Sequence, residues 1–195
     1  MYKRQATTRD VLRGLFPSAL ELLGPPYDAG SRIWIPRETL EMRVGKRGAT
    51  LAARLNAGAL EIGPNVRLGR YVVVGDGARL GECSVGDEAE ISPRATVYRS
   101  VVGEGSLIGP HARLSEAVTG LMSDIRSLGE RPTVVEKRCA VGDECLLEPG
   151  VHLSGRVYIH PRLRVPAGMV LRGPCEVAGS QQLDQCASRP RRKRD

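Results

Sequence analysis

The sequence predicts an all-β fold in which short parallel strands stack as the coils of a solenoid. From Ile62 onward an aliphatic residue recurs about every six positions, and a small or apolar residue follows four places later. Neither series admits a charged residue, which indicates that both positions point into a core. A fixed short period is typical of a solenoid, because each repeat buries its apolar face only against its neighbours. The first series is Ile62, Leu68, Val74, Leu80, Val85, Ile91, Val97, Val102, Ile108 and Leu114, and it resumes with Val135, Val141, Leu147, Leu153, Ile159, Val165 and Leu171.

Each six-residue unit predicts a short strand followed by a corner. Glycine occupies the second position of many units, for example Gly63, Gly103 and Gly142, where a Cβ would crowd a tight bend. Three units close one triangular coil, and the next coil stacks about 4.8 Å away through parallel hydrogen bonds. The pattern over residues 60–172 resembles the left-handed parallel β-helix of the hexapeptide-repeat family. It predicts a left-handed β-helix of about five to six coils, with a mixed α/β cap at the N-terminal end and a protruding loop.

Three irregular steps interrupt the rhythm. The steps that begin at Leu80 and Val97 are one residue short, and the step that begins at Leu114 is long. Grouped three units per coil, all three steps fall on the corner between the first and second faces. We therefore expect an inserted loop at residues 117–133 that protrudes from this corner. Its apolar residues leave two roles open, because it can fold on its own coil, or it can reach a neighbouring subunit or close a site.

The segments before and after the repeats differ in kind. Residues 1–60 predict a cap with a helix from Thr7 to Leu23 and strand-like alternation at 32–35 and 40–44. Such a cap covers the open end of the solenoid, which would otherwise be a bare sheet edge that invites aggregation. The predicted β-helix spans residues 61–175, and residues 176–195 are expected to form a basic, disordered tail.

Composition narrows the class of protein. The five basic residues of the tail outweigh Asp195 and supply +4 of the net charge of +7. The high isoelectric point is therefore largely an effect of the tail, and a solvated tail is favoured over nucleic-acid binding. The five cysteines contain no CxxC pair, and Cys139 and Cys145 fall in an inward position, which predicts small core residues. A signal peptide and an apolar run long enough for a membrane span are not apparent, and a reduced cytoplasm is the expected compartment.

Two of the histidines fall at positions of the predicted prism that suggest different roles. His152 ends the unit 147–152 at the corner of the insertion, one coil further on. A histidine beneath a protruding loop can act as a general base, although a structural or interface role is also open. His111 falls in a predicted ladder of Gly77, Arg94, His111, Glu144 and Arg162 on successive coils, and we interpret this histidine as structural.

A basic strip is the second candidate site. His160, Arg162 and Arg164 alternate outward and could hold phosphate groups, although a solvated face explains them equally well. Arg126 and Arg131, which the insertion carries, are added as candidate ligand-binding residues. We expect no metal site, because His152 and His160 stand eight positions apart and point to different faces.

A closer resemblance rests on three stretches. The run Ser100-Val101-Val102-Gly103-Glu104-Gly105-Ser106-Leu107-Ile108-Gly109-Pro110 is similar to the C-terminal β-helix of sugar-1-phosphate nucleotidyltransferases. The later order of an insertion, then Ala140-Val141-Gly142-Asp143, then Glu148-Pro149-Gly150-Val151, is similar as well. In the bifunctional members of that family the β-helix also acetylates an amino-sugar phosphate. The nucleotide-binding domain and its Gly-rich, Lys-bearing signature are not present here, so nucleotidyl transfer is not expected of this chain alone.

The resemblance implies two functions of different classes. The first is an acyltransferase that uses acetyl-CoA or another acyl-CoA and acts on a sugar or sugar phosphate, with His152 as the base. The second is a non-catalytic β-helix that oligomerises with, or regulates, a separate nucleotidyltransferase subunit. The chain could also be this domain cut from a longer protein. Both functions imply a homotrimer and a sugar-phosphate or nucleotide-sugar ligand, because flat prism faces pack around a threefold axis.

Overall fold

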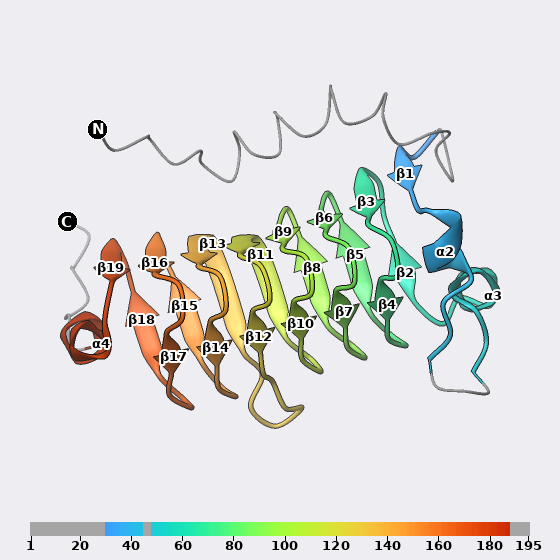
Figure 1. Cartoon of the computed structure of the whole chain (residues 1–195). Helices are drawn as coiled ribbons and strands as arrows, with labels where there is room; N and C mark the ends of the chain where they lie inside the picture. The colour runs from blue at the N-terminus through green and yellow to red at the C-terminus, as the bar shows by residue number, and fades with distance from the viewer. Residues whose placement is uncertain (1–29, 45–47, 188–195) are drawn as a thin grey trace, which may run out of the picture.

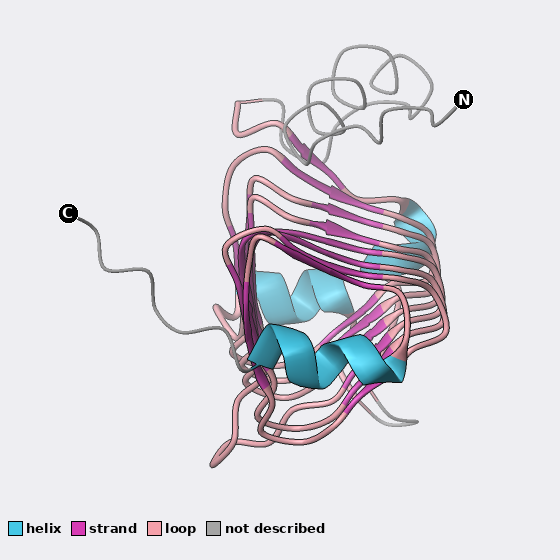
Figure 2. Ribbon diagram, turned by 90° about the vertical axis from the view of Figure 1, so that its left-hand side faces the viewer, coloured by secondary structure: helices cyan, strands magenta, loops and turns pink. Residues whose placement is uncertain are grey.

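The computed structural model of the chain describes residues 30–44 and 48–187. They form a left-handed parallel β-helix of triangular section, which confirms the predicted fold class (Figures 1 and 2). One face is a six-stranded parallel sheet, and the other two faces together form a 13-stranded sheet. Since each coil contributes one strand to the six-stranded sheet, the stack holds six coils.

The three faces are named A, B and C in the order in which the chain visits them. Face A holds β2 (Glu61–Ile62), β5 (Arg79–Gly81), β8 (Thr96–Tyr98), the first halves of β11 (Arg113–Thr119) and β13 (Val134–Val141), β15 (His152–Ser154) and β18 (Val170–Arg172). Face B holds β1 (Ile33–Trp34), β3 (Val66–Leu68), β6 (Ser84–Val85), β9 (Val101–Val102), the second halves of β11 and β13, β16 (Val157–Ile159) and β19 (Cys175–Val177). Face C holds β4 (Val73–Val74), β7 (Glu90–Ile91), β10 (Leu107–Ile108), β12 (Asp124–Ile125), β14 (Leu146–Leu147) and β17 (Arg164–Val165).

The core is the interior of the prism. The aliphatic residues of the predicted first series are almost all fully buried, for example Ile91, Ile108 and Leu147 at 0% exposure. Cys139 and Cys145 are buried there too, as predicted, and burial raises the pKa of both thiols. The interior is therefore the apolar column that the six-residue period predicts, and the polar chemistry of the molecule lies on the outside and at the corners.

The corner between faces B and C contains a column of glycines on five successive coils: Gly69, Gly86, Gly103, Gly120 and Gly142. These glycines do not adopt positive φ. A Cβ on any of them would instead overlap the backbone of the next coil. The expected reason for the second-position glycines, crowding at a bend, is thus refined to close approach between stacked coils.

Aspartates reinforce the same corner. Asp87 follows Gly86, and its Oδ1 accepts the backbone N–H of Arg70 on the preceding coil at 2.9 Å. Asp143 follows Gly142 and accepts the N–H of Leu121 in the same way at 2.8 Å. The pKa of Asp87 is lowered mainly by that backbone hydrogen bond, against the opposing effect of burial. The recurrent Gly-Asp pair therefore joins coils that the flat strands alone would connect only at the faces.

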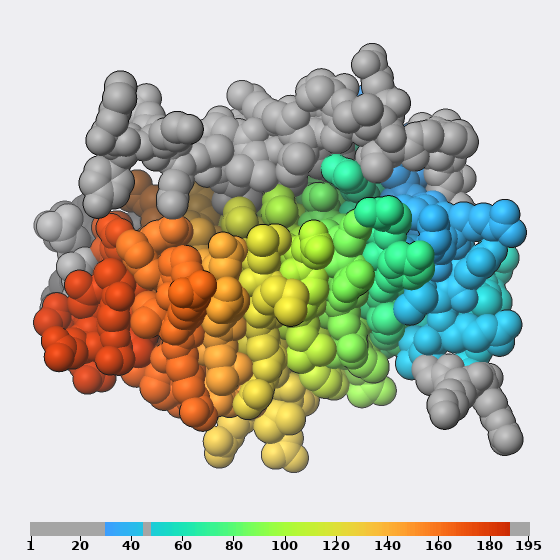
Figure 3. All heavy atoms as spheres, in the orientation of Figure 1, coloured from blue at the N-terminus to red at the C-terminus, as the bar shows by residue number. Residues whose placement is uncertain are grey.

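The insertion is shorter than expected and lies at another corner. Residues 117–119 belong to β11, and β12 at 124–125 is a regular strand of face C. Only residues 126–133 leave the coil, at the corner between faces C and A (Figures 1 and 3). At the equivalent corners of other coils, four residues connect the face-C strand to the face-A strand, for example 109–112 between β10 and β11. The segment 126–133 therefore contains four extra residues. The predicted boundaries of 117–133, and the corner assigned to them, are wrong.

Polar residues at inward positions caused this error. Thr119 lies between Val102 and Val141 of the neighbouring coils, whereas Ser123 stacks on Ser106, and the two residues are 2% and 1% exposed. Thr119 Oγ1 accepts the Gly103 N–H at 3.3 Å, and Ser123 Oγ donates to the Gly142 carbonyl at 2.8 Å. Because buried hydroxyls with partners are tolerated, a complete coil is present where the aliphatic pattern lapses.

Both ends of the stack are covered. At the first coil, β1 pairs with β3, and the helices α2 (Arg37–Leu40) and α3 (Leu51–Asn56) lie over the open end. Thr39 Oγ1 donates to the Gly69 carbonyl at 2.7 Å and accepts the Val72 N–H at 3.2 Å, which ties the cap to the first corner. The strand expected at 32–35 is found as β1. In place of the strand expected at 40–44, Leu40 ends α2 and Arg43 makes an isolated bridge. The helix expected at residues 7–23 lies outside the described residues.

The far end differs from the expected tail. Residues 175–177 form β19, paired with β16, and α4 (Ser180–Ala187) lies across the last coil (Figure 2). Leu183 and Cys186 of α4 are buried against the core. A tail beginning at residue 176 is therefore too early, because two apolar residues at helical spacing suffice to dock a polar segment. In the described ranges, the helices are too short or too polar to span a membrane.

Candidate functional site

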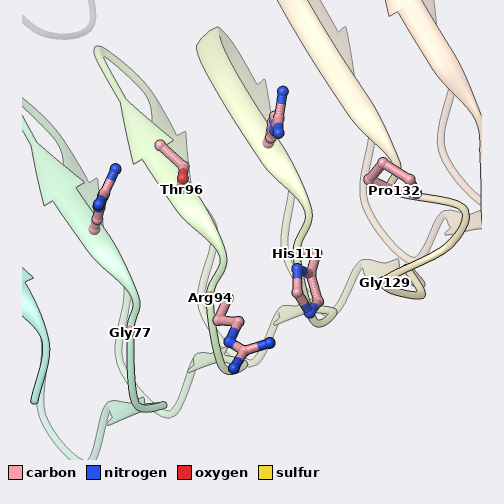
Figure 4. Close-up of a pocket in the computed structure, with 8 residues that line it drawn as sticks. Gly77, Arg94, Thr96, His111, Gly129 and Pro132 are labelled. Atoms are coloured by element: carbon pink, nitrogen blue, oxygen red, sulfur yellow. The ribbon is translucent and has the colours of Figure 1, made fainter.

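A basic groove runs along the corner between faces C and A, beside the inserted loop (Figure 4). Its volume is about 440 Å³. Two rows of side chains line it, one on face A and one on the corner itself. The row on face A is Arg79, Thr96 and Arg113, and the row on the corner is Gly77, Arg94 and His111.

The register of the coils sets both rows. Thr96 pairs with Arg79 on one side and with Arg113 on the other. At the corner, the Arg94 N–H donates to the Asp76 carbonyl at 2.9 Å, and the His111 N–H donates to the Pro93 carbonyl at 3.1 Å. Members of a row are thus 17 residues apart in sequence and about 4.8 Å apart in space. The ladder of Gly77, Arg94 and His111 is confirmed.

The second part of that predicted ladder is wrong. Glu144 and Arg162 lie on the corner between faces B and C, where Arg162 Nε is 3.2 Å from Glu144 Oε2. These two residues form an ion pair, but it lies on a different corner from His111. The misplaced insertion shifted every later unit by one face, and so it assigned these two residues to the corner of His111.

Two glycines let the corner side chains lie flat along the groove. A Cβ on Gly77 would lie 3.1 Å from Cγ of Arg94, so the arginine stem crosses the space that a side chain would fill. A Cβ on Gly129 would lie 3.3 Å from Nε2 of His111, so the inserted loop contacts the imidazole directly. Gly77 has a φ of +70°, a conformation that glycine adopts without strain.

The inserted loop forms the wall of the groove. Its base is fixed by Thr133, whose Oγ1 donates to the Arg126 carbonyl at 2.6 Å, and by Ser127, whose Oγ accepts the Thr133 N–H at 3.0 Å. Leu128 and Arg131 close the tip with paired backbone hydrogen bonds. Gly129 and Pro132 face the groove. The loop thus borders the groove, and its contact with a neighbouring subunit stays a prediction.

His152 lies on the other side of the loop. It is outward-facing on β15 and pairs in register with Val134, the residue that follows the loop. It lies one coil beyond the insertion, as predicted, but on a strand of face A and not at the corner itself. Its Nε2 is 3.3 Å from Glu136 Oε1, and its side chain is 39% exposed. Burial opposes ionisation of Glu136, but hydrogen bonds from His152 and Lys137 outweigh it and lower the pKa of the carboxylate.

The predicted basic strip is paired with carboxylates. His160 Nε2 lies 2.6 Å from Glu176 Oε1, and Arg164 Nη2 lies 2.7 Å from Glu148 Oε1. Arg162 pairs with Glu144, as described above. The three residues also occupy different elements, since His160 follows β16, Arg162 is on a corner and Arg164 is on β17. Their positive charge is largely neutralised, which leaves little to attract a phosphate group.

The two candidates in the insertion lie at its base and at its tip. Arg126 pairs with Asp124 at 2.8 Å and approaches Glu148 at 3.6 Å, on the outer surface of face C. Arg131 closes the tip of the loop, and its Cβ faces Gly150 of the next coil. Neither side chain lines the groove.

The sequence interpretation missed the groove residues Arg94 and Arg113. The signal that reveals them is the spacing of 17 residues, which stacks position 94 on 111 and position 96 on 113. His111, interpreted as structural, proves to be the histidine that the loop contacts. Groups of three or more His, Cys, Asp or Glu side chains that could hold a metal ion are not found in residues 30–44 and 48–187.

The fold and the coil pattern define a hexapeptide-repeat β-helix protein. Residues 51–127 match the family model described as the GMPPB C-terminal domain. This match confirms the resemblance to the C-terminal β-helix of sugar-1-phosphate nucleotidyltransferases.

Curated relatives agree with the match. The chain is 31% identical over 144 residues to a probable mannose-1-phosphate guanylyltransferase 3 of Oryza sativa subsp. japonica, covering 67% of this chain and 35% of the relative. It is 26% identical over 110 residues to a probable mannose-1-phosphate guanyltransferase of Schizosaccharomyces pombe, covering 56% of this chain and 26% of the relative. The chain therefore spans only about a quarter to a third of the length of these relatives.

Solved structures with some similarity are hexapeptide acyltransferases. One is a mutant form of perosamine N-acetyltransferase from Caulobacter crescentus, in complex with CoA and GDP-perosamine, with a TM-score of 0.40 and 17% identity over 67% of this chain and 62% of that one. Another is UDP-N-acetylglucosamine acyltransferase of Francisella novicida, with a TM-score of 0.40 and 15% identity over 62% of this chain and 59% of that one. At these scores the likeness says nothing about the activity of this chain.

Proposed function

We propose that this chain is the β-helix half of a sugar-nucleotide-forming enzyme, and that it assembles or regulates the nucleotidyltransferase part. The observation that carries this proposal is the match of residues 51–127 to the GMPPB C-terminal domain. The curated relatives support it, because the matched region is a minor part of proteins named as guanylyltransferases. In this function the chain forms a homotrimer or a mixed assembly, and the ligand of the whole system is a sugar phosphate or a nucleotide sugar.

The structure is compatible with a structural role. The prism offers three flat sheet faces, and flat faces suit packing against further copies or another domain. The candidate base His152 lies on one of these open faces, and the groove lies on the opposite side of the loop. A function in assembly requires neither an acyl donor nor a catalytic base.

A domain exchange tests the proposal. Residues 30–187 would replace the C-terminal β-helix of the rice relative, and the chimaera would be compared with the same enzyme truncated before its β-helix. We expect the chimaera to regain the oligomeric mass and the rate of GDP-mannose synthesis of the intact enzyme, measured by sedimentation and by chromatography of the product. A chimaera that forms the oligomer no better than the truncated enzyme, and is no faster, would contradict an assembly role.

A second candidate function is acyl transfer, favoured by the His152–Glu136 pair. A carboxylate beside an imidazole orients it and stabilises its protonated form. With acetyl-CoA or another acyl-CoA as donor, His152 would remove the proton from an acceptor hydroxyl or amine. The acceptor oxygen or nitrogen would then attack the thioester carbonyl, and CoA would leave as its thiol.

Substitution of His152 tests the acyl-transfer candidate. His152→Ala is expected to lower the rate of CoA release with an amino-sugar phosphate acceptor by about 100-fold or more, since a positioned base contributes that much. Arg70→Gln, on a different corner, serves as the control and should keep the wild-type rate. Release of CoA at equal rates by the wild type and by His152→Ala would remove the histidine from the mechanism.

A further inference from the structure

We propose that the basic groove between Arg94, His111 and Arg113 is a binding site for the phosphate groups of a small phosphorylated molecule, with a diphosphate as the best fit. The site rests on residues of this chain and does not depend on the proposed function. It is distinct from the predicted strip of His160, Arg162 and Arg164.

The first argument is uncompensated charge. Several arginines on other corners are paired with carboxylates, as in Arg99 with Glu82 at 2.8 Å and Arg162 with Glu144 at 3.2 Å. Within residues 30–44 and 48–187, the structure gives no carboxylate partner for the side chains of Arg94 or Arg113.

The surroundings of the groove do not cancel this charge. No acidic residue is among the groove-lining residues of the described chain. Asp76, which adjoins Gly77 on this corner, is already held by the buried Arg54 at 2.7 Å. Arg79 has only a long contact of 3.6 Å with Glu61, and both of those side chains are largely exposed. A concave surface lined by one sign of charge focuses the field on a counter-charged ligand.

The second argument is the arrangement of donors. Thr96 lines the groove from face A, while Arg94 and His111 line it from the corner (Figure 4). Arg113, which lies next to Thr96 on face A, lines the groove as well. Two guanidinium groups, an imidazole and a hydroxyl therefore border one groove from two sides. Guanidinium forks bind phosphate oxygens with two parallel hydrogen bonds. Since the donors are spread over two adjacent coils, two linked phosphates engage them better than one does.

The third argument is the shape of the groove. Its volume of about 440 Å³ lies within the range of about 300–1,000 Å³ that is usual for small-molecule sites. The loop carrying Gly129 and Pro132 closes one end and supplies an uncharged wall. A nucleic-acid strand needs a groove that continues past the contact, and the loop interrupts this one. A compact ligand with an uncharged part next to its phosphates fits the groove.

Calorimetry with inorganic pyrophosphate, inorganic phosphate and GDP-mannose tests the proposal at low ionic strength. The double variant Arg94→Gln/Arg113→Gln is compared with the matched control Arg162→Gln/Arg164→Gln, which removes the same charge from paired arginines on the other side of the loop. Both pairs are exposed, so equal melting temperatures would verify that both variants fold. We expect the groove variant to weaken pyrophosphate binding by about tenfold or more, and the control by about twofold or less.

The ligand series distinguishes the sources of the phosphate. Pyrophosphate should bind tighter than phosphate, and still tighter binding of GDP-mannose would identify a nucleotide sugar as the occupant. If both double variants weakened pyrophosphate binding equally, the loss of net charge would explain the effect, and the proposed site would be wrong. Failure of the wild-type protein to bind pyrophosphate at millimolar concentration would overturn it as well. A DNA oligonucleotide that binds more tightly than pyrophosphate, with loss only in the groove variant, would also contradict a small-molecule ligand.

Discussion

Replacement of Gly103 by alanine is expected to destabilise the β-helix by about 3 kcal/mol or more, although it adds only one methyl group. A Cβ at this position would overlap the carbonyl group of Gly120 on the next coil and approach Leu121 N to 2.8 Å. The obstacle is the backbone of the next coil and not a side chain, so a rotamer change cannot relieve it. The two coils have to separate at this corner, and the ladder hydrogen bond from the Gly103 N–H to the Thr119 carbonyl, now 3.0 Å long, would weaken.

The matched control is Gly179→Ala. Gly179 has no heavy atom within 4 Å of the added Cβ, and it does not have a positive φ. Its substitution should change the free energy of unfolding by no more than about 0.5 kcal/mol. Urea denaturation of both variants, followed by circular dichroism, measures the difference. Equal midpoints for Gly103→Ala and Gly179→Ala would show that the coils do not stack as closely at this corner as the structure has them.

Deletion of residues 118–132 is expected to prevent folding of the β-helix, whereas deletion of Leu128–Arg131 should be tolerated. The long deletion removes Val118 and Thr119, the β11 residues that pair with β9, and all of β12, so one coil loses its pairing on faces B and C. The ladders on both sides of that gap would lose their partners, and unpaired buried backbone is costly. The short deletion removes only the four extra residues and leaves Thr133, which holds the base of the loop.

Far-UV circular dichroism and urea unfolding measure both deletions. The short deletion should stay within about 1 kcal/mol of the wild-type stability, because shortening a surface loop changes its closure entropy little. The long deletion should give an unfolded or aggregated chain. Cooperative unfolding of the long deletion at the wild-type midpoint would mean that residues 118–125 are an insertion after all, as the aliphatic pattern alone suggests.

The fold could be predicted because its signal repeats. Each coil offers the same two inward positions, so a lapse in one coil does not hide the architecture. The boundaries of the insertion could not be predicted, because Thr119 buries a hydroxyl where the pattern calls for an aliphatic side chain, and Ser123 buries a second hydroxyl soon after it. Their hydrogen bonds to adjacent coils compensate for that burial, and this compensation is visible only in three dimensions.

The site was harder to predict than the fold. The contact between His111 and Gly129 depends on which corner carries the loop, and a shift of one face moved the expected site to His152. The charge balance of the basic strip also depends on the phase of the later coils, since Glu144, Glu148 and Glu176 neutralise it from neighbouring turns. Single residues in a repeat protein acquire meaning only once the register is correct.

Each corner of the β-helix repeats one structural position per coil, and the groove corner repeats it at Gly77, Arg94 and His111. Arg94 and His111 occupy this position in two adjacent coils, and Gly77 occupies it in the preceding coil without a side chain. The backbone at each of these positions is fixed by the coils on either side, so the side chains there can change while the coil geometry stays the same. Ligand preference on such a scaffold can therefore evolve by single substitutions at stacked positions. Proteins with the same coil stack can bind different ligands without a change of fold.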